Sequence, residues 1–235
     1  MLSNKKKILI LGGSSDIGKT LVNILSQNNN YELFIHHSKF ISLKKKRSTY
    51  IKYNFLEYKN KFPKKITKIF SDNFDVIINL VGYIDGKGYL TTDVNQTLSS
   101  IKVNCLIPNE IIRMNLNHMI KKKYGRIINI SSIGVKFGGG KKTYNYSISK
   151  HCLEFISKEI RDLASKNILI NNLRVGVTNT KIHKKIKNNL DLKKRIKLIP
   201  IKRMISTEEV AEFIKIFVED NLIITNETIA LSGGE

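Results

Sequence analysis

The sequence predicts an α/β protein in which about seven parallel strands form one doubly wound sheet with helices on both faces. Short apolar runs rich in β-branched residues alternate with longer amphipathic segments, as strands and helices do in such a sheet. The first apolar run leads through glycines into an amphipathic segment. A length of 235 residues fits one large domain better than two, so we expect a single domain over residues 1–235.

Each element is expected where its pattern is clearest. The expected strands are 7–11, 31–37, 49–53, 76–80, 126–131, 169–175 and 228–231, and the expected helices are 16–27, 97–122, 143–166 and 207–220. A basic, irregular segment over 179–203 follows the sixth strand. Ligands bind at the carboxyl edge of doubly wound sheets, so we expect this segment to be a substrate lid.

The chain is strongly basic, with 41 Lys and Arg against 19 Asp and Glu, a formal charge of +22. Such a charge favours acidic partners through long-range steering, or reflects biased composition on a solvated surface. The lysines are scattered in short clusters and accompany no recognisable nucleic-acid motif. We therefore do not expect nucleic-acid binding, although salt-dependent binding to nucleic acid stays an alternative to test.

Cysteine, histidine and apolar patterns exclude several classes of protein. Cys105 and Cys152 lack metal-type spacing, so we expect neither a disulfide framework nor a zinc site. Four histidines, His36, His118, His151 and His183, also lack ligand-like spacing, and we expect surface or packing roles and no metal. No apolar run approaches the roughly 20 residues that a membrane helix needs. We expect a soluble, cytoplasmic protein without membrane attachment.

The stretch "LILGGSSDIGKT", residues 9–20, has the order strand, glycine turn, helix. This order places a pyrophosphate on free N–H groups at the helix amino terminus. Asp16 is unexpected there, because glycine normally lets the backbone approach an anion. We expect Asp16 to cap the helix with its carboxylate turned away from the phosphates, so that binding survives.

The stretch "YNYSISK" places Tyr146 and Lys150 four residues apart, on one face of a predicted helix. An ammonium beside a phenol lowers the pKa of the phenol toward working pH, as a general acid requires. On these two residues alone, an ordinary exposed Tyr and Lys pair explains the spacing equally well.

Further stretches, in order, resemble the short-chain dehydrogenase/reductase family of classical type over nearly the whole chain. The glycine loop is similar to its T-G-x-x-x-G-x-G turn, and "YNYSISK" to its Tyr-x-x-x-Lys pair. The other matching stretches are "DVIINLVG", "IKVNCLIP", "GRIINISS", "INNLRVGVTNT", "IPIKRMISTEEVAEFI" and "LSGGE". The matches depart from the family pattern at Asp16 and at Val175, which replaces a proline. The stretch "DVIINLVG" also lacks the Asn-Ala of the family's N-N-A-G motif and retains only Asn79 and Gly82 of it.

The resemblance implies a Rossmann-type fold and a four-residue catalytic site. Tyr146 would protonate a carbonyl oxygen, and Lys150 would lower the pKa of Tyr146 and bind the nicotinamide ribose. Ser132 would hold the substrate oxygen, and Asn104 would support a water-linked proton relay. Ser131 is an alternative to Ser132, because the loop that follows is about one residue longer than usual. Tyr144 competes with Tyr146, but Ile148 rather than lysine stands four residues after it.

The resemblance also implies a nicotinamide cofactor. The expected cofactor-binding residues are Gly12, Ser14, Ser15, Asp16, Ile17, Gly18, His37, Ser38, Lys39, Asn54, Asn79, Gly82, Tyr146, Lys150, Val177 and Thr180. An acid after the second strand would favour NAD(H), whereas here His37, Ser38 and Lys39 could receive a 2′-phosphate. We therefore expect NADP(H) more than NAD(H).

The function that follows is NADP(H)-preferring reduction of a ketone, 3-oxoacyl or keto-sugar carbonyl to an alcohol, or the reverse oxidation. The basic charge favours an anionic substrate or one carried on acyl carrier protein. The alternative is a catalytically silent, dinucleotide-binding sensor, toward which the departures at Asp16 and Val175 point. The family implies a homodimer or homotetramer through the helices that carry Asn104 and Tyr146.

Overall fold

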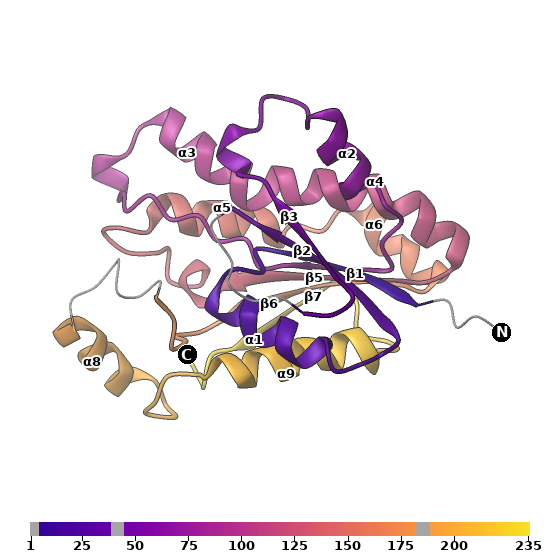
Figure 1. The fold of residues 1–235 in the computed structure, drawn as a ribbon. Helices are drawn as coiled ribbons and strands as arrows, with labels where there is room; N and C mark the ends of the chain where they lie inside the picture. Colours follow the sequence, from indigo (N-terminus) through magenta and orange to yellow (C-terminus); the bar gives the residue numbers. More distant parts are fainter. Residues whose placement is uncertain (1–4, 39–44, 182–188) are drawn as a thin grey trace.

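A computed structural model describes residues 5–38, 45–181 and 189–235 of the chain. It contains one seven-stranded sheet in the order β3-β2-β1-β4-β5-β6-β7, and every neighbouring pair is parallel (Figure 1). The strands are β1 (Lys6–Leu11), β2 (Tyr31–His37), β3 (Ser48–Lys52), β4 (Val76–Asn79), β5 (Gly125–Ser132), β6 (Ile168–Val175) and β7 (Glu227–Leu231). The predicted fold class is confirmed, and each predicted strand is present to within one residue at either end.

Helices cover both faces of this sheet. They are α1 (Asp16–Leu25), α2 (Lys64–Phe70), α3 (Val94–Ile101), α4 (Ile107–Lys122), α5 (Tyr144–Glu154), α6 (Lys158–Asp162), α8 (Asn189–Leu198) and α9 (Thr207–Glu219). In Figure 1, α1 and α9 lie together on one face, and α2, α4 and α5 lie on the other. The two faces of the sheet therefore form two separate apolar layers.

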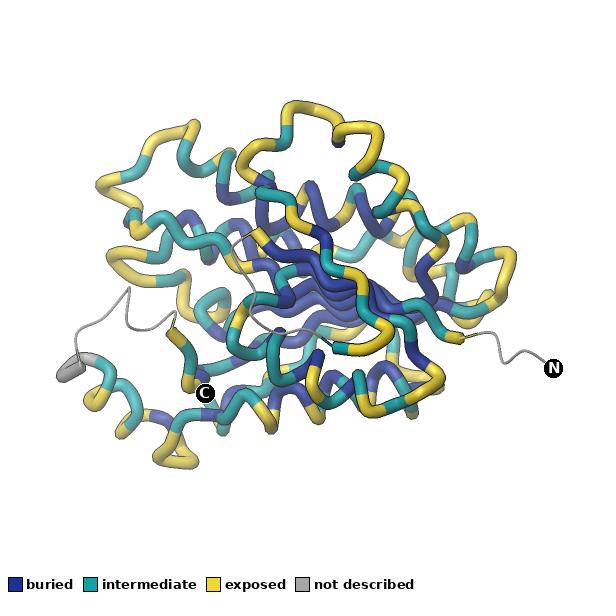
Figure 2. Tube along the Cα trace, viewed as in Figure 1, coloured by how far each residue is buried: buried dark blue, intermediate teal, exposed yellow. Residues whose placement is uncertain are grey.

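Alternation along the central strands divides the core between these layers. Ile8 and Ile10 pack in the layer of α1 and α9, whereas Leu9 and Leu11 pack in the layer of α2 and α4. All four side chains are fully buried, as Figure 2 shows for the sheet as a whole. Strands covered on both faces read as continuous apolar runs, which is why the sequence predicts them so closely.

Two of the predicted long helices are interrupted. The helix expected over 97–122 begins at Val94 and passes through a π-helical segment, Lys102–Leu106, before α4. The helix expected over 143–166 ends at Glu154, and α6 starts after Ser157, whose side chain accepts from the Ile160 N–H. The sequence pattern also gave no indication of α2. The π-helical segment contains the predicted site residue Asn104.

Part of the predicted lid over 179–203 is described. Residues 182–188 lie outside the described residues, and α8 occupies most of the remainder. Arg195 of α8 lies over the ring of Phe137, which follows β5, with 5.4 Å between the guanidinium carbon and the ring centroid. The described part of the predicted lid therefore contacts the loop between β5 and α5.

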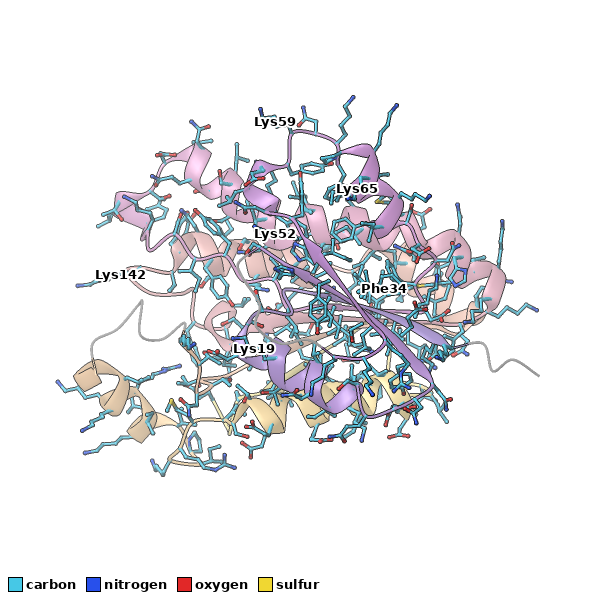
Figure 3. All side chains as sticks on the ribbon, viewed as in Figure 1. Lys19, Phe34, Lys52, Lys59, Lys65 and Lys142 are labelled. Atoms are coloured by element: carbon cyan, nitrogen blue, oxygen red, sulfur yellow. The ribbon has the colours of Figure 1, made fainter. Side chains whose placement is uncertain are left out.

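The positive charge is distributed over several elements. Figure 3 labels Lys19 on α1, Lys52 at the end of β3, Lys59 and Lys65 near α2, and Lys142 before α5. This spread resembles a solvated surface more than a single stripe for a nucleic-acid backbone. Among the described helices, none is long and apolar enough to cross a membrane.

Candidate active site

The glycine turn between β1 and α1 is built so that only glycine fits. Gly12 has φ +80°, and a Cβ there would lie 3.0 Å from the Leu80 carbonyl group. A Cβ on Gly18 would lie 2.8 Å from the Gly12 oxygen. The first N–H groups of an α-helix have no partner within the helix, so the start of α1 faces this turn with free donors. The turn therefore fits the pyrophosphate of a dinucleotide.

Ser15, rather than Asp16, caps α1. The Ser15 hydroxyl accepts a hydrogen bond from the Gly18 N–H at 3.0 Å, and Asp16 is the first residue of the helix. The Asp16 carboxylate instead accepts from the backbone N–H of Lys181 at 2.7 Å. The expected capping role of Asp16 is thus wrong, because the hydroxyl one residue earlier already occupies that position. Asp16 links the glycine turn to the segment after β6.

We expect Asp16→Gly to change the dissociation constant for NADPH by less than about tenfold, or about 1.4 kcal/mol. The carboxylate bonds to Lys181 rather than to the N–H groups of α1, so its removal frees no donor of the helix. Isothermal titration of both proteins with NADPH measures the change. Binding that appears only in the variant would contradict this account of Asp16.

His36, expected to be a packing residue, also supports the glycine turn. Its Nδ1 accepts from the Gly12 N–H at 3.3 Å, its Nε2 contacts the Tyr53 oxygen at 2.8 Å, and its ring stacks on Phe55. Burial lowers the pKa of His36 to about 4, and its hydrogen bond with Tyr53 opposes that shift. A neutral His36 is therefore part of the framework beneath the turn.

The titration of His36 predicts acid sensitivity. The pKa of His36 is lower in the folded chain than the unfolded value of 6.5, so this stabilisation is complete above pH 6.5 and is lost as the pH falls toward 4. The loss is on the order of 3 kcal/mol. Asparagine does not titrate, so we expect His36→Asn to lack this pH-dependent part of the free energy of unfolding. Urea unfolding at several pH values measures that free energy for both proteins. An equal loss of stability in acid for the wild type and the variant would contradict the prediction.

We expect Gly18→Ala to weaken dinucleotide binding by more than about tenfold, because its methyl group would press on the Gly12 carbonyl and deform the turn. Gly140→Ala is the matched control: its Cβ would only meet the Thr143 hydroxyl at 3.6 Å. Fluorescence titration with NADPH compares the two variants. Equal affinities for NADPH would show that the turn takes no part in binding.

Other predicted cofactor residues differ in how they are placed. Asn79 is fully buried; its amide group donates to Asn129 and accepts from the Val81 N–H. Asn79 therefore supports the end of β4, from which the chain runs on to Gly82. Gly82 is exposed, and a Cβ on it would lie 3.8 Å from Cε2 of Tyr146.

The predicted 2′-phosphate residues are only partly described. His37 is 7% exposed and its ring meets the edge of Tyr50, Ser38 is exposed, and Lys39 lies outside the described residues. Asn54 accepts from the Leu56 N–H and so caps a short 3₁₀ turn. Ser38 is therefore the accessible group that the structure describes at the end of β2.

The segment after β6 brings the remaining predicted cofactor residues to the carboxyl edge. Val177 is buried and its carbonyl accepts from the Ile205 N–H at 2.9 Å. The Thr180 hydroxyl is placed by a bond of 3.4 Å to the Thr178 carbonyl, one residue before Lys181. Ser14 and Ile17, in the glycine turn, are both partly exposed.

Asn104 holds the chain after β4 in place. Its side-chain oxygen accepts from the Tyr83 N–H at 2.7 Å, and its amide nitrogen donates to the Tyr83 carbonyl and to the Ser149 hydroxyl. The side chain is fully buried in the π-helical segment, an irregularity common at functional sites. Because both amide protons are used, the side chain clamps the chain after β4 to α5.

The two candidate serines face different groups. Ser131 is buried and its hydroxyl donates to Glu154 at 2.6 Å. Ser132 is partly exposed, accepts from the Gly134 N–H at 3.1 Å and hydrogen-bonds with Tyr146. Successive residues of a strand point to opposite faces, so only one of the two can reach the tyrosine. The geometry therefore favours Ser132 over Ser131.

Tyr146 and Lys150 lie on α5 beside the carboxyl ends of β4 and β5. The Lys150 ammonium donates to the carbonyl groups of Val81 at 2.7 Å and Ile130 at 2.5 Å, and lies 5.9 Å from the centroid of the Tyr146 ring. The competing Tyr144 packs edge-on against Tyr89 instead. The four predicted catalytic side chains are thus grouped around the chain that leaves β4.

Burial dominates the acid–base properties of the pair. It raises the pKa of Tyr146 to about 12, with the hydrogen bond of Ser132 acting in the opposite direction. It lowers the pKa of Lys150 to about 7, against the effects of Cys105 and Glu154. The expected lowering of the Tyr146 pKa by Lys150 is not found, because the ammonium bonds to the Val81 and Ile130 carbonyl groups instead. Tyr146 is therefore a protonated phenol near neutral pH.

Sequence reasoning missed three groups that shape the site. His36 supports the glycine turn, Tyr83 is the partner of Asn104, and Glu154 is the partner of Ser131. None of them stands in a recognisable motif, and only their position relative to the motif residues indicates a role. Among the described residues, no group of three or more His, Cys, Asp or Glu side chains converges as a metal site would require.

Comparison with known proteins places the chain among relatives. A family model described as "Enoyl-(Acyl carrier protein) reductase" matches residues 59–235. A 3-oxoacyl-[acyl-carrier-protein] reductase, FabG, of Buchnera aphidicola subsp. Schizaphis graminum is 29% identical over 245 residues, which cover 100% of this chain and 98% of that protein.

Solved structures show the same fold. A 4-hydroxyisoleucine dehydrogenase complexed with NADH has a TM-score of 0.85 at 20% identity, covering 98% of both chains. A 3-oxoacyl (acyl-carrier-protein) reductase from Agrobacterium tumefaciens with NADP bound has a TM-score of 0.81 at 18% identity, covering 100% of this chain and 98% of that one. With the family model matching most of the sequence, the chain belongs to the short-chain dehydrogenase/reductase family of oxidoreductases.

Proposed function

We propose that this chain is an NADPH-preferring carbonyl reductase whose substrate is a 3-oxoacyl thioester on an acidic carrier. The observation that carries the proposal is the placement of Tyr146, with Ser132 and Lys150 beside it, next to the exposed Gly82 at the carboxyl edge of the sheet. The relatives named as 3-oxoacyl-[acyl-carrier-protein] reductases support the substrate class.

The residues divide the work of the reduction. A bound nicotinamide dinucleotide supplies the hydride that reduces the carbonyl carbon. Ser132 hydrogen-bonds the substrate oxygen, and Tyr146 donates its phenolic proton to that oxygen as the carbon–oxygen double bond becomes single. Lys150 stabilises the phenolate that remains. Asn104 fixes the chain after β4 against which these groups are arranged.

Basic side chains near the site support an acidic carrier. Lys141 and Lys142 are exposed just before α5, and Lys136 lies in the same loop after β5 (Figure 3 labels Lys142). A cluster of one sign beside a site steers an oppositely charged partner. Exposed apolar side chains, Leu98, Leu106 and Phe155, support the predicted homodimer or homotetramer.

The test measures the oxidation of NADPH and of NADH by the purified protein with three substrates. They are acetoacetyl acyl carrier protein, acetoacetyl coenzyme A and a keto-sugar. We expect turnover with both thioesters, the lowest KM with the carrier protein, and a preference for NADPH of more than about tenfold. Equal turnover with NADH would overturn the cofactor preference. Tight NADPH binding without turnover on any substrate would support the silent sensor instead.

A further inference from the structure

A half-buried ion pair joins the end of α5 to β6. Glu154, the last residue of α5, receives two bonds from Arg174 of β6, at 2.8 Å from Nε and 2.6 Å from one terminal nitrogen. The Ser131 hydroxyl donates to the same carboxylate at 2.6 Å. The Glu154 side chain is only 7% exposed, so this carboxylate is held by three fixed donors away from bulk water.

The same residue ends the catalytic helix. The backbone carbonyl of Glu154 accepts from the Asn172 amide at 2.9 Å, and Phe155 leaves the helix with extended backbone angles. Asn172 in turn belongs to a row of buried side-chain amides across the sheet, in which Asn129 donates to Asn172 and Asn79 donates to Asn129. This network explains why the helix predicted over 143–166 is interrupted here.

Glu154 also faces the catalytic lysine. It stands four residues after Lys150, one turn along the same face of α5. Cys105 of the π-helical segment and Tyr146 are the other titratable groups near the Lys150 ammonium, and burial raises the pKa of the Cys105 thiol to about 11, so that it is neutral. Glu154 therefore carries the negative charge one turn from Lys150, and Arg174 is paired with that carboxylate.

We propose that Glu154 is a positioning residue of the catalytic site: held by Arg174 and Ser131, it fixes α5 on β5 and β6 and provides the charge that keeps the Lys150 ammonium protonated. The expected effect on the pH profile of turnover rests on the proposed reductase function. The expected effect on the pKa of Lys150 does not. The charge of Glu154 acts against the burial that lowers the pKa of Lys150.

The two partners of the ion pair must then affect Lys150 in opposite directions. Removal of the Glu154 charge leaves Arg174 to disfavour the ammonium, so the pKa of Lys150 falls. Removal of the Arg174 charge leaves Glu154 uncompensated, so the pKa of Lys150 rises. A purely structural ion pair predicts the same outcome for both variants, namely loss of stability and activity without opposite pH shifts.

The experiment measures Lys150 directly and then through turnover. Protein labelled with ¹³C at lysine Cε is titrated by NMR, and the Lys150 signal is assigned by its absence from Lys150→Met. We expect Glu154→Gln to lower the pKa of Lys150 and Arg174→Met to raise it, each by about half a unit or more. Glu154→Gln/Arg174→Met should fall between them, and Arg174→Lys should restore the wild-type value.

The pH profile of kcat/KM should move in the same way. The fall in activity at higher pH occurs at a lower pH in Glu154→Gln and at a higher pH in Arg174→Met. The control Glu159→Gln removes an exposed acid of α6 outside this network and leaves the position of the fall unchanged. NMR shifts in one direction for both variants, or no shift in either folded variant, would overturn the proposal. The NMR titration does not depend on turnover, so failure of the proposed reductase function would be recognised separately.

Discussion

Replacing Tyr146 with phenylalanine is expected to lower kcat/KM for carbonyl reduction by about 10²- to 10⁴-fold, the usual contribution of a positioned general acid. In the proposed reaction the phenol beside Ser132 is the proton donor, and burial raises its pKa to about 12. The ring itself remains in the variant and still lies next to Gly82, so the packing around it is preserved. Single-turnover oxidation of bound NADPH separates the chemical step from binding.

Tyr144→Phe is the matched control for this result. Tyr144 lies two residues earlier, its ring packs on Tyr89 at 5.1 Å between centroids, and it has no place in the proposed proton transfer. We expect it to keep activity within about threefold of the wild type. Loss of activity in Tyr144→Phe together with an active Tyr146→Phe would exchange the roles of the two tyrosines and overturn the assignment.

Replacing Lys150 with methionine is expected to lower kcat/KM by at least about a hundredfold, because the phenolate that forms on Tyr146 would lose its nearby cation. Burial lowers the pKa of Lys150 to about 7, so wild-type activity should fall as the pH rises above that value. Lys166→Met removes an exposed lysine just before β6, at the opposite edge of the sheet from the site, and should keep the wild-type rate and pH profile. A Lys150→Met enzyme as active as this control would contradict the assignment.

The same variant should change stability in a pH-dependent way. Lys150 donates to the Val81 and Ile130 carbonyl groups, and leaving each buried acceptor without a donor costs about 1 to 3 kcal/mol. Since the pKa of Lys150 is depressed by folding, the wild type gains stability from this group as the pH rises from 7 toward 10.5. The destabilisation by Lys150→Met should therefore be larger at pH 9 than at pH 6 in urea unfolding.

Local patterning was enough to predict the layers and the strands of this protein. A strand such as β4, buried on both faces, reads as an unbroken apolar run, and its neighbour in the sheet does not change that pattern. The spacing of Tyr146 and Lys150 on one helix is likewise a local property. Such features depend on residues close together in the chain, so a single sequence reveals them.

Tertiary structure alone decided which polar groups meet. Asp16 bonds to Lys181, 165 residues away, His36 supports the turn at Gly12, and Asn172 ends α5 at Glu154. A carboxylate or an amide satisfies its hydrogen bonds with any suitable partner, so nothing in its own stretch of sequence specifies which one. The sheet pairs β5 with β6, and α5 packs on both strands, so Ser131 and Arg174 reach Glu154. Ser132 is left to face Tyr146, because alternate residues of a strand point to opposite sides.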